Sequence, residues 1–520
     1  MKYGFTQGQF LSYSDIENLT KALKMGLDFK VDKSKSVVHF KEQEDIMTSL
    51  IEPLPKKSLD LDKVLNECKE KIIDGSVNFS SPNFMAFPDC GNSTAAMCGH
   101  IISGMLNQNL INSIHTSPTA TFVEMTVINW LREILGYEVT KNPKTSLDVG
   151  GINVPGGTMA NTSAVLLARE RARPSSMEGG MYKSEKLKMF IPKGIGHYTS
   201  KAAMSWLGLG KDNIIEVETT NEFKIDKKDL INKIKECKKV GDIPFILIAY
   251  AGDSRTMAID DFAELSEIAK EGNIWFHIDA CHGASLCFSD KLKSRLGRIE
   301  LADSITIDPH KVLFVPYPCS YLLVKNPADL KPISGVSDLI TKEKYSFGQI
   351  TPFLGSRAFD SLKVWFLIKN LGKERIGELI EKRHELARYF EDELKKQEGF
   401  YLLNKVIINS SVFIYIPKES KEKLELNIDD QETIILINEL NLRIQKKMFK
   451  QGKFYVHTFK IDDFMNKIGA GREKNFQVQR LMIGNPLTTE KDITELIECL
   501  KKTAMEEWKI LSHEKSIHRN

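Results

Sequence analysis

Residues 304–311 read Ser304-Ile305-Thr306-Ile307-Asp308-Pro309-His310-Lys311, a short apolar strand that runs into a turn. The proline enforces the turn, and Lys311 is presented just beyond it. A surface position is the usual fate of a lysine, but the apolar stretches on both sides, 305–307 and 312–316, argue against full exposure. A lysine amine becomes nucleophilic when burial or nearby cations disfavour its charge. Lys311 is therefore a candidate nucleophile.

A second strand, upstream, ends on a carboxylate. Residues 275–280 read Trp275-Phe276-His277-Ile278-Asp279-Ala280. An ionised acid in a buried place is costly unless it is paired, so Asp279 needs a cation, either in a structural ion pair or on a ligand. His277 should point to the same side of the strand, and we interpret it as a core histidine whose hydrogen bonds are satisfied.

Together, the two strand ends offer the groups that a protein must supply to pyridoxal phosphate. That cofactor needs a lysine for a Schiff base and an acid beside its pyridine nitrogen. A strand-end lysine alone would say little, whereas Lys311 and Asp279 in this order and spacing form a specific pair. We therefore predict a pyridoxal-phosphate site and no metal site.

The middle of the chain has the sequence pattern of a parallel sheet. Between about 150 and 325, short apolar runs alternate with polar segments of helical length; the runs are 189–191, 245–248, 275–278, 305–307 and 321–324. Such strands predict an α/β fold with a mainly parallel sheet covered on both faces. Ligands of such sheets bind beyond the carboxyl ends of the strands, where Lys311 and Asp279 fall.

The length of 520 residues is enough for two or three domains. We expect an N-terminal helical segment (1–110), a large cofactor-binding domain (111–375) and a small C-terminal α+β domain (376–520). Helices are predicted over 59–73, 94–110, 117–135, 355–371 and 376–394, the third with Ser117 as N-cap and Pro118 at its first position. Strands are predicted near 406–408 and 412–416.

Composition excludes several classes of partner. The net charge is +3, from 72 basic and 69 acidic residues, so nothing indicates a nucleic acid or a membrane. The eight cysteines are scattered without a CxxC pair, which indicates free thiols in a reducing compartment. The first residues lack an apolar signal core, and no stretch is apolar enough to span a bilayer. We expect a cytoplasmic protein.

Two further motifs carry candidate ligand groups. Gly156-Gly157-Thr158 precedes a helical segment, so its backbone could approach an anion at a helix start, although a simple turn is the commoner meaning of two glycines. The ending of a Walker loop is missing. His197, after the 189–191 strand, could stack on a flat ring or cap a helix.

With these motifs in order, the chain resembles the group II pyridoxal-phosphate-dependent amino-acid decarboxylases, which act on glutamate, aromatic amino acids, tyrosine, diaminobutyrate and cysteine sulfinate. The similarity runs from about Ser80 to the C-terminus. The motifs that carry it are Ser117-Pro118, Gly156-Gly157-Thr158, 197–202, 277–280, 302–304, 308–311, 355–357, 359–363 and Arg480.

The resemblance implies fold type I, with a mainly parallel seven-stranded sheet. It also implies a homodimer with both active sites at the subunit interface, in which segment 1–110 of each chain would wrap around the partner chain. It implies that Lys311 holds the cofactor, Asp279 pairs with the ring nitrogen and His197 stacks on the ring. The remaining cofactor-binding residues that it implies are Gly157, Thr158, Ser254 and His310.

The resemblance also implies residues that act on the substrate. Tyr345 matches a loop tyrosine that assists proton delivery, and Phe84 falls at the substrate. Arg480 resembles an arginine that meets a substrate carboxylate; a surface arginine on an edge strand is the alternative. The chain departs from the family pattern at Val312, at Cys281 and over 251–255, and these departures concern the substrate pocket.

We predict the decarboxylation of an L-amino acid to its amine, with release of carbon dioxide. An aminotransferase or an oxygen-consuming aldehyde synthase on the same fold is the main alternative, and a non-catalytic protein on this fold is a second. The identity of the amino acid stays open, because Arg480 favours an acidic substrate while segment 315–317 resembles tyrosine decarboxylases.

Overall fold

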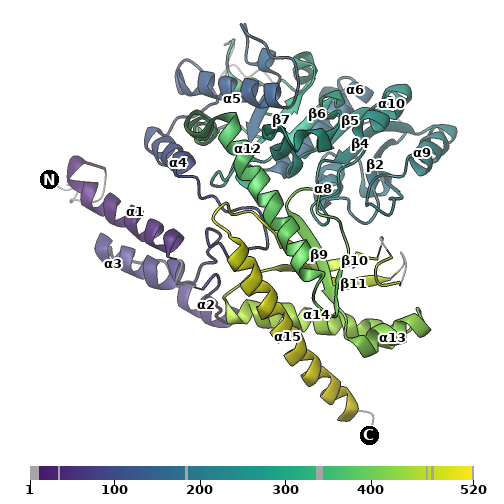
Figure 1. Cartoon of the computed structure of the whole chain (residues 1–520). Helices are drawn as coiled ribbons and strands as arrows, with labels where there is room; N and C mark the ends of the chain where they lie inside the picture. Colours follow the sequence, from purple (N-terminus) through teal and green to yellow (C-terminus); the bar gives the residue numbers. More distant parts are fainter. Residues whose placement is uncertain are drawn as a thin grey trace.

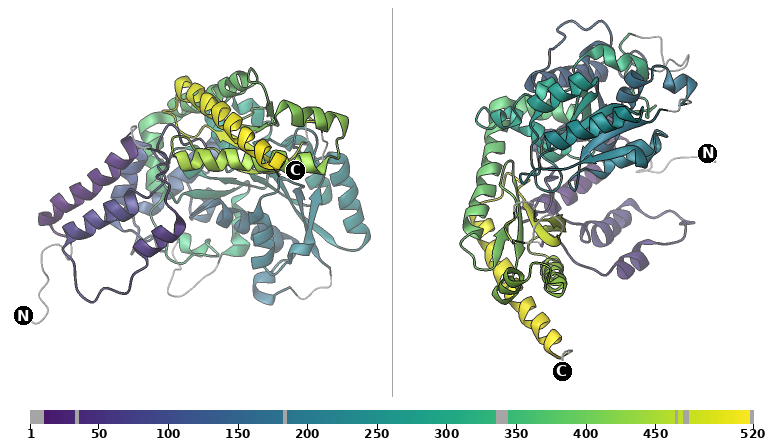
Figure 2. Two further views of the ribbon diagram at one scale, coloured as in Figure 1. Left: turned by 90° about the horizontal axis from the view of Figure 1, so that it is seen from below. Right: turned by 90° about the vertical axis from the view of Figure 1, so that its right-hand side faces the viewer.

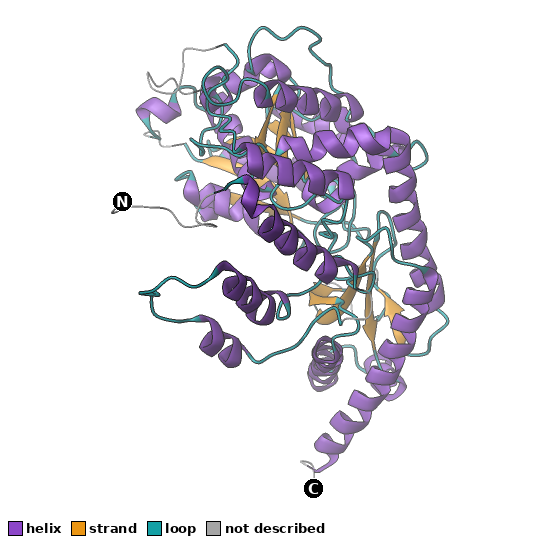
Figure 3. Cartoon of the chain, turned by 90° about the vertical axis from the view of Figure 1, so that its left-hand side faces the viewer, coloured by secondary structure: helices purple, strands orange, loops and turns teal. Residues whose placement is uncertain are grey.

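The computed structural model describes residues 11–32, 36–181, 185–334, 344–463, 466–469 and 474–517. Two β-sheets lie apart from each other, and the long helix α12 (Ser361–Leu394) passes from one to the other along one side of the molecule (Figures 1 and 3). The boundaries predicted at 110/111 and 375/376 remain predictions, and α12 runs across the second.

The larger sheet has seven strands among the described residues. Their spatial order is β1 (Gly151–Val154), β7 (Ser320–Val324), β6 (Ser304–Ile307), β5 (Trp275–Asp279), β4 (Ile243–Tyr250), β2 (Leu187–Pro192) and β3 (Ile214–Val217). Only β7 runs antiparallel to its neighbours, and the other adjacent pairs are parallel. The predicted α/β fold with a mainly parallel sheet is confirmed. Each of the five predicted runs forms a strand; β1 and β3, at the two edges, were not predicted.

The strand register brings the candidate groups to one edge of this sheet. Asp279, the last residue of β5, is level with Tyr250 on β4 and with Thr306 on β6. Every residue of β5 and β6 is buried, as expected for central strands covered on both faces. Because β6 ends at Ile307, the turn and the short helix α11 (Pro309–Val312) emerge beside Asp279.

Helices cover the sheet on both sides (Figures 1 and 2). They include α5 (Ala120–Ile134), α6 (Gly157–Ala172), α7 (Ser176–Gly179), α8 (Tyr198–Trp206), α9 (Lys227–Lys239) and α10 (Phe262–Gly272). α5 begins later than predicted: its N-cap is Thr119, and the Ser117 hydroxyl is bonded to Thr121 instead. Phe122 of α5 is 47% exposed although it is a large apolar side chain.

α12 connects the two sheets with one break. Gly372 has φ 68° and ψ 170°, which are not helical, so the single element corresponds to the two helices predicted over 355–371 and 376–394. The first of these starts later than expected, at Ser361. A positive φ favours glycine at this break because a Cβ would be strained there.

The smaller sheet is antiparallel, in the order β10 (His457–Asp462), β11 (Asn475–Met482), β9 (Ser410–Tyr415) and β8 (Phe400–Leu402). Helices α13 (Lys418–Leu426), α14 (Gln431–Gln451) and α15 (Glu490–Ile517) accompany it. The strand predicted at 406–408 is wrong: this stretch is an irregular loop between β8 and β9. The apolar residues of this loop pack between the two sheets and do not pair with a neighbouring strand.

The N-terminal helices α1 (Ile16–Val31), α2 (Gln43–Leu50) and α3 (Leu61–Glu67) stand away from both sheets (Figures 1 and 2). None of them has a buried residue. α4 (Thr94–Leu106), by contrast, packs against α12. Within the described ranges, no helix has both the length and the apolar content needed to cross a bilayer.

Candidate active site

A cavity of about 330 Å³ opens at the carboxyl edge of the large sheet. Seven predicted site residues line it: Gly157, Thr158, His197, Ser254, Asp279, His310 and Lys311. They come from four strand-to-helix connections and from the turn after β4, so that parts of the chain more than 150 residues apart meet in one space. An amine and a carboxylate that face the same cavity can reach one small molecule.

Lys311 is paired with the carboxylate next to its turn. Its Nζ lies 2.8 Å from Asp308 Oδ2, and Asp308 Oδ1 accepts a hydrogen bond of 2.6 Å from the Ser320 hydroxyl. Burial alone would lower the pKa of Lys311, but the charge of Asp308 raises it well above its ordinary value. Burial opposes ionisation of Asp308, yet the Lys311 charge holds the pKa of Asp308 down at about 2. Without a ligand, the site is therefore an ion pair.

Asp279 is held by a chain of hydrogen bonds that starts in the core. Its Oδ2 accepts from Asn161 Nδ2 at 2.8 Å and its Oδ1 accepts from the Cys281 N–H at 3.1 Å. Asn161 Oδ1 faces His277 Nε2 at 3.1 Å, and His277 Nδ1 faces the Ser304 hydroxyl at 2.8 Å. Burial lowers the pKa of His277 to about 4. A neutral His277 that accepts from Ser304 and donates to Asn161 fixes the direction of the whole chain.

His277 is thus the satisfied core histidine that the sequence predicted. Its role is to set the Asn161 amide so that the amide donates to Asp279. The Asp279 carboxylate is thereby oriented from behind, while it still lines the cavity. Such outer support is what keeps a charged group in one productive orientation.

His197 both caps a helix and faces the cavity. It is the N-cap of α8, where its Nδ1 accepts from the Thr199 N–H, and its own N–H donates to the Tyr250 hydroxyl at 2.8 Å. Burial lowers the pKa of His197, which favours a neutral ring. The two interpretations of this histidine that the sequence left open, a ring stack and a helix cap, are therefore compatible.

The start of α6 forms a cradle for an anion. Met159 and Ala160 are the first residues of α6 whose N–H groups bond to the Gly156 carbonyl, so those of Gly157 and Thr158 precede the helical ladder. A Cβ on Gly157 would lie 2.8 Å from Asp308 Oδ2 and from Cys281 Sγ, so only glycine lets the chain pass here. His310 is buried beside this cradle and its Nδ1 donates to the Cys319 carbonyl at 2.7 Å.

Three predicted substrate residues do not line the cavity. Phe84 is stacked on Phe79, with ring centroids 4.5 Å apart. Tyr345 lies against Phe122 of α5, with centroids 5.3 Å apart. Arg480 donates to the backbone carbonyls of Ser254 and Ala86.

The alternative meaning of Arg480, a surface arginine on an edge strand, is wrong. β11 lies between β10 and β9, and Arg480 is only 4% exposed. Its guanidinium lies over the rings of Phe87 and Phe459, and burial lowers its pKa to about 10. Arg480 supports the Ser254 wall of the cavity and does not reach into the cavity.

Several residues of the site were not predicted. Asn161, Tyr250, Cys281, His282, Asp308 and Tyr317 also line the cavity. The position of Asn161, one helical turn beyond Gly157-Thr158 on the same helix, was the signal available for it. Asp308 precedes Lys311 by three residues, Cys281 follows Asp279 by two and Tyr317 lies in segment 315–317, so these three also had a signal in the sequence. For Tyr250 and His282 no pattern exists, because their place depends on which strands become neighbours.

These residues fit pyridoxal phosphate. The cavity offers an amine, an oriented carboxylate, a flat imidazole and unbonded N–H groups at a helix start. Among the described residues, the buried Asp308 Oδ2 faces Lys311 Nζ at 2.8 Å and His310 Nε2 at 3.7 Å. Each group matches a different part of that cofactor: aldehyde, ring nitrogen, ring face and phosphate.

Comparisons with known proteins give the same result. Residues 44–416 match the family model described as the pyridoxal-dependent decarboxylase conserved domain. The acidic amino acid decarboxylase GADL1 of Xenopus tropicalis is 30% identical over 410 residues, which are 77% of this chain and 78% of that protein. Phenylacetaldehyde synthase of Petunia hybrida is 28% identical over 484 residues, 89% of this chain and 93% of that protein. The crystal structure of mouse CSAD in apo form has a TM-score of 0.84 at 24% identity and covers 95% of this chain and 99% of that one.

The fold and the site define an enzyme that depends on pyridoxal phosphate. Within that class, the chain belongs to the family of group II pyridoxal-phosphate-dependent decarboxylases. The predicted family and cofactor are thereby confirmed.

Proposed function

We propose that the chain decarboxylates an L-amino acid to the corresponding amine and releases carbon dioxide. The observation that carries the proposal is the shared cavity, in which Lys311 and Asp279 face one space at the ends of neighbouring strands. Membership of the decarboxylase family supports the same reaction.

When bound, pyridoxal phosphate supplies a sink for the electron pair that remains on Cα after carbon dioxide leaves. Lys311 would hold the cofactor through its amine. Asp279, oriented by Asn161, would keep a proton on the ring nitrogen because its negative charge favours the protonated ring. His197 would cover one face of the ring, and the N–H groups of Gly157 and Thr158, with His310 and Ser254, would hold the phosphate end.

The last step adds a proton at Cα, and we assign its delivery to Tyr345. In its own chain Tyr345 rests on Phe122, outside the cavity. Phe122 is half-exposed on the surface of α5. Tyr345 would therefore act at the active site of a second subunit, which a homodimer with sites at its interface provides.

The N-terminal helices support such a homodimer. α1 exposes the apolar side chains Ile16, Leu19, Leu23, Leu27 and Val31, spaced three or four residues apart on one face. A contiguous apolar stripe of this kind marks an interface in a soluble protein. A second copy of the chain would cover it. Light scattering on the purified protein should give twice the mass of the 58.9 kDa chain.

The test of the reaction is a stoichiometric one. The purified holoenzyme is screened against the common L-amino acids under air and under argon. We expect one amino acid to give equal amounts of carbon dioxide and amine, at a rate that oxygen does not change. No carbon dioxide from any amino acid, or turnover that requires an added oxo acid, would refute the proposal.

An aldehyde synthase is the second candidate, because the chain is similar to phenylacetaldehyde synthase over most of both lengths. Such a reaction consumes oxygen and gives an aldehyde in place of the amine. In the same experiment it would stop under argon.

Arg480 is the residue that bears on the substrate class. Its Nη1 and Nη2 donate to the Ser254 and Ala86 carbonyls, while its buried Nε has no acceptor among the described residues. A guanidinium has five N–H donors, so Arg480 keeps donors for a carboxylate although it does not line the cavity. Glutamate, aspartate and the aromatic amino acids are therefore the first set to compare. We also propose a reducing, cytoplasmic location, which the eight free cysteines support.

A further inference from the structure

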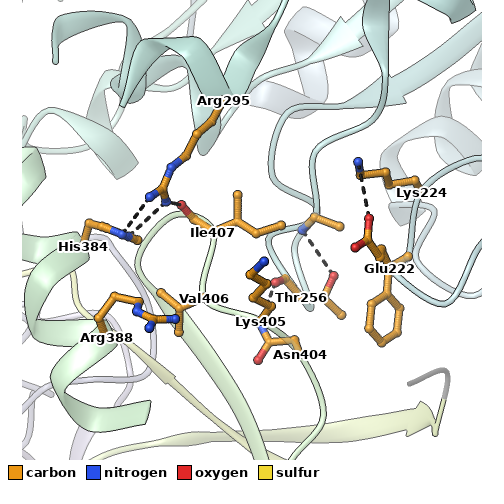
Figure 4. Close-up of a pocket in the computed structure, with 12 residues that line it drawn as sticks. Glu222, Lys224, Thr256, Arg295, His384, Arg388, Asn404, Lys405, Val406 and Ile407 are labelled. Carbon is orange, nitrogen blue, oxygen red and sulfur yellow. Dashed lines mark hydrogen bonds and ion pairs between the residues drawn. The ribbon is translucent and has the colours of Figure 1, made fainter. Parts of the chain in front are cut away.

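A second cavity, of about 390 Å³, lies between the two sheets and shares no lining residue with the active site. One side comes from the large-sheet region: the segment 222–224, the turn residues Thr256 and Ala258, and Arg295. The other side comes from the second half of α12, with His384 and Arg388, and from the loop 404–407. Figure 4 shows side chains of both parts around this space.

The lining is rich in cations. Arg295, Arg388, Lys405 and Lys224 face one acidic residue, Glu222. Lys224 already has acidic partners, Asp261 at 3.3 Å and Glu222 at 3.5 Å. Arg388 is paired with Glu391 at 2.7 Å.

Arg295 and Lys405 differ from Lys224 and Arg388, which have acidic partners. Among the described residues, no carboxylate lies within ion-pair distance of either. Arg295 donates to the Ile407 carbonyl and, at 3.1 Å, to His384 Nε2. His384 Nδ1 donates to the Ile408 carbonyl at 2.7 Å, so His384 takes part as a neutral acceptor. Lys405 makes no hydrogen bond within the part of the chain that the structure describes.

Arg295 and Lys405 are solvent-exposed side chains that line the cavity without a carboxylate partner among the described residues. Partial burial, followed by the charge of Arg388, lowers the pKa of Arg295, which means that the two guanidinium groups repel each other. An oxyanion between them would relieve the repulsion, and the planar donor fork of arginine suits carboxylate and phosphate oxygens. The neutral His384 and the Asn404 amide add no charge that could take its place.

We propose that this cavity binds a small dianion, held by Arg295 and Lys405 with Arg388 at its edge. The ligand is defined by its chemistry, two negative charges on oxygens, which a phosphate group or a dicarboxylate offers. The volume admits a molecule with several carbon atoms besides the charged groups, because one water takes about 30 Å³ in the liquid.

The bound anion would touch the back of the active-site wall. The turn 252–258 separates the two cavities: Gly252 and Ser254 line the active site, and Thr256 and Ala258 line the second cavity. Asp253 fixes this turn, since its carboxylate accepts from the N–H groups of Arg255, Thr256 and Ala258. The Asn404 amide donates to the Thr256 carbonyl at 2.8 Å and so joins the turn to the smaller domain.

The test is calorimetric titration of the holoenzyme with inorganic phosphate, and separately with succinate, at constant ionic strength. Bound cofactor fills the phosphate cradle of the active site, so inorganic phosphate can bind only elsewhere, and any succinate bound in the substrate pocket is recognised because Lys405→Gln leaves that binding unchanged. We expect saturable binding of one anion per chain for at least one of the two probes. Lys405→Gln and Arg295→Gln should each weaken it tenfold or more.

Arg298→Gln is the matched control, because Arg298 lies close in sequence, is exposed and already pairs with Glu300. It should leave the anion affinity unchanged. Lys405→Gln removes no hydrogen bond or ion pair of the described residues, so the variant should fold like the parent. An unchanged cofactor absorbance would verify this. Equal affinity in Lys405→Gln and the parent, or only weak, unsaturable binding of both probes, would overturn the proposal. Because the readout is heat of binding, its failure is distinct from a failure of the proposed reaction.

Discussion

The two cavities on either side of turn 252–258 differ in whether their cationic side chains have acidic partners. In the active site, the one lysine is compensated by Asp308 within hydrogen-bond distance, and Asp279 is oriented by an amide. In the second cavity, Arg295 and Lys405 lack any acidic partner among the described residues. The difference teaches that the first site is balanced by its own carboxylate before its cofactor arrives, whereas the exposed cations of the second are left to solvent or to an anion from outside.

Lys311→Ala should have the largest effect. Turnover should fall by roughly 10³-fold or more, because a covalent group of the mechanism is lost. Borohydride treatment followed by peptide mass spectrometry should find the cofactor on Lys311 in the parent and nowhere in the variant. Lys201→Ala, an exposed and ion-paired lysine on α8, is the control and should keep both activity and adduct. An adduct on Lys405 instead would place the cofactor in the second cavity and refute the assignment of the active site.

Asp308→Asn should destabilise the apoenzyme at neutral pH, because it leaves Lys311, whose side chain is 23% exposed, without its ion-pair partner; the cost should stay below the roughly 3–5 kcal/mol of a fully buried pair. The Lys311 charge overcomes burial and depresses the pKa of Asp308 from 3.8 to about 2. The ion pair therefore stabilises the folded state fully above pH 3.8, and this contribution is lost as the pH falls towards 2.

Thermal unfolding of the apoenzyme between pH 2 and pH 7 measures this effect. The melting temperatures of parent and variant should differ most at neutral pH and converge at the acid end. Asp290→Asn, which removes an exposed aspartate paired with two lysines, should change little at any pH. A constant difference over the whole range would mean that Asp308 is not part of a compensated pair.

Asp279→Asn should lower kcat by roughly 10²–10³-fold, the range found when one preorganised electrostatic group is removed. Asn161→Ala removes only one bond to that carboxylate and should cost less. The absorbance of the bound cofactor, which reports how much cofactor the protein holds, separates this loss from a loss of cofactor. If both variants kept the parent spectrum and kcat, Asp279 would not face the ring.

The predicted site residues that line the cavity share one property: they end or follow a strand. Asp279 is the last residue of β5, and Lys311, His197 and Gly157 lie just beyond β6, β2 and β1; parallel strands bring their carboxyl ends to one edge. Motif order was therefore enough to place them together.

What the sequence could not give depends on side-chain direction and on the meeting of distant segments. The guanidinium of Arg480 points to the Ser254 and Ala86 carbonyls, a choice that only the packing of the two domains determines. In the edge strands β1 and β3, Asn153 and Glu216 interrupt the apolar residues, so neither strand has an apolar run of three. The second cavity is built from ordinary surface cations of separate segments, none of which forms a motif.

Tyr345→Phe tests whether the active site is complete within one chain. It should lower kcat by roughly 10²-fold with KM nearly unchanged, as expected for loss of a proton donor. Phe122→Leu, which removes the ring beneath Tyr345, serves as the control for packing.

Mixing subunits sharpens the result. A heterodimer of Lys311→Ala and Tyr345→Phe would contain one active site with both Lys311 and Tyr345 intact, provided that the tyrosine comes from the partner subunit. Activity that rises well above that of either variant alone supports action across the interface. Activity no higher than the sum of the two variants would place Tyr345 at the site of its own chain, or outside both.

Asn404→Ala should have the smallest effect, and it tests the wall between the cavities. The variant removes the bond to the Thr256 carbonyl and leaves the Val412 N–H without its Asn404 acceptor. We expect cofactor affinity to fall by about fivefold, since a lost hydrogen bond of this kind is worth about 1 kcal/mol. Lys405→Ala, next in the chain, should leave cofactor affinity unchanged. Because Asn404 does not line the active-site cavity, a loss of cofactor affinity would pass through turn 252–258, to which Asn404 is bonded. An unchanged cofactor affinity would mean that the two cavities are neighbours without being coupled.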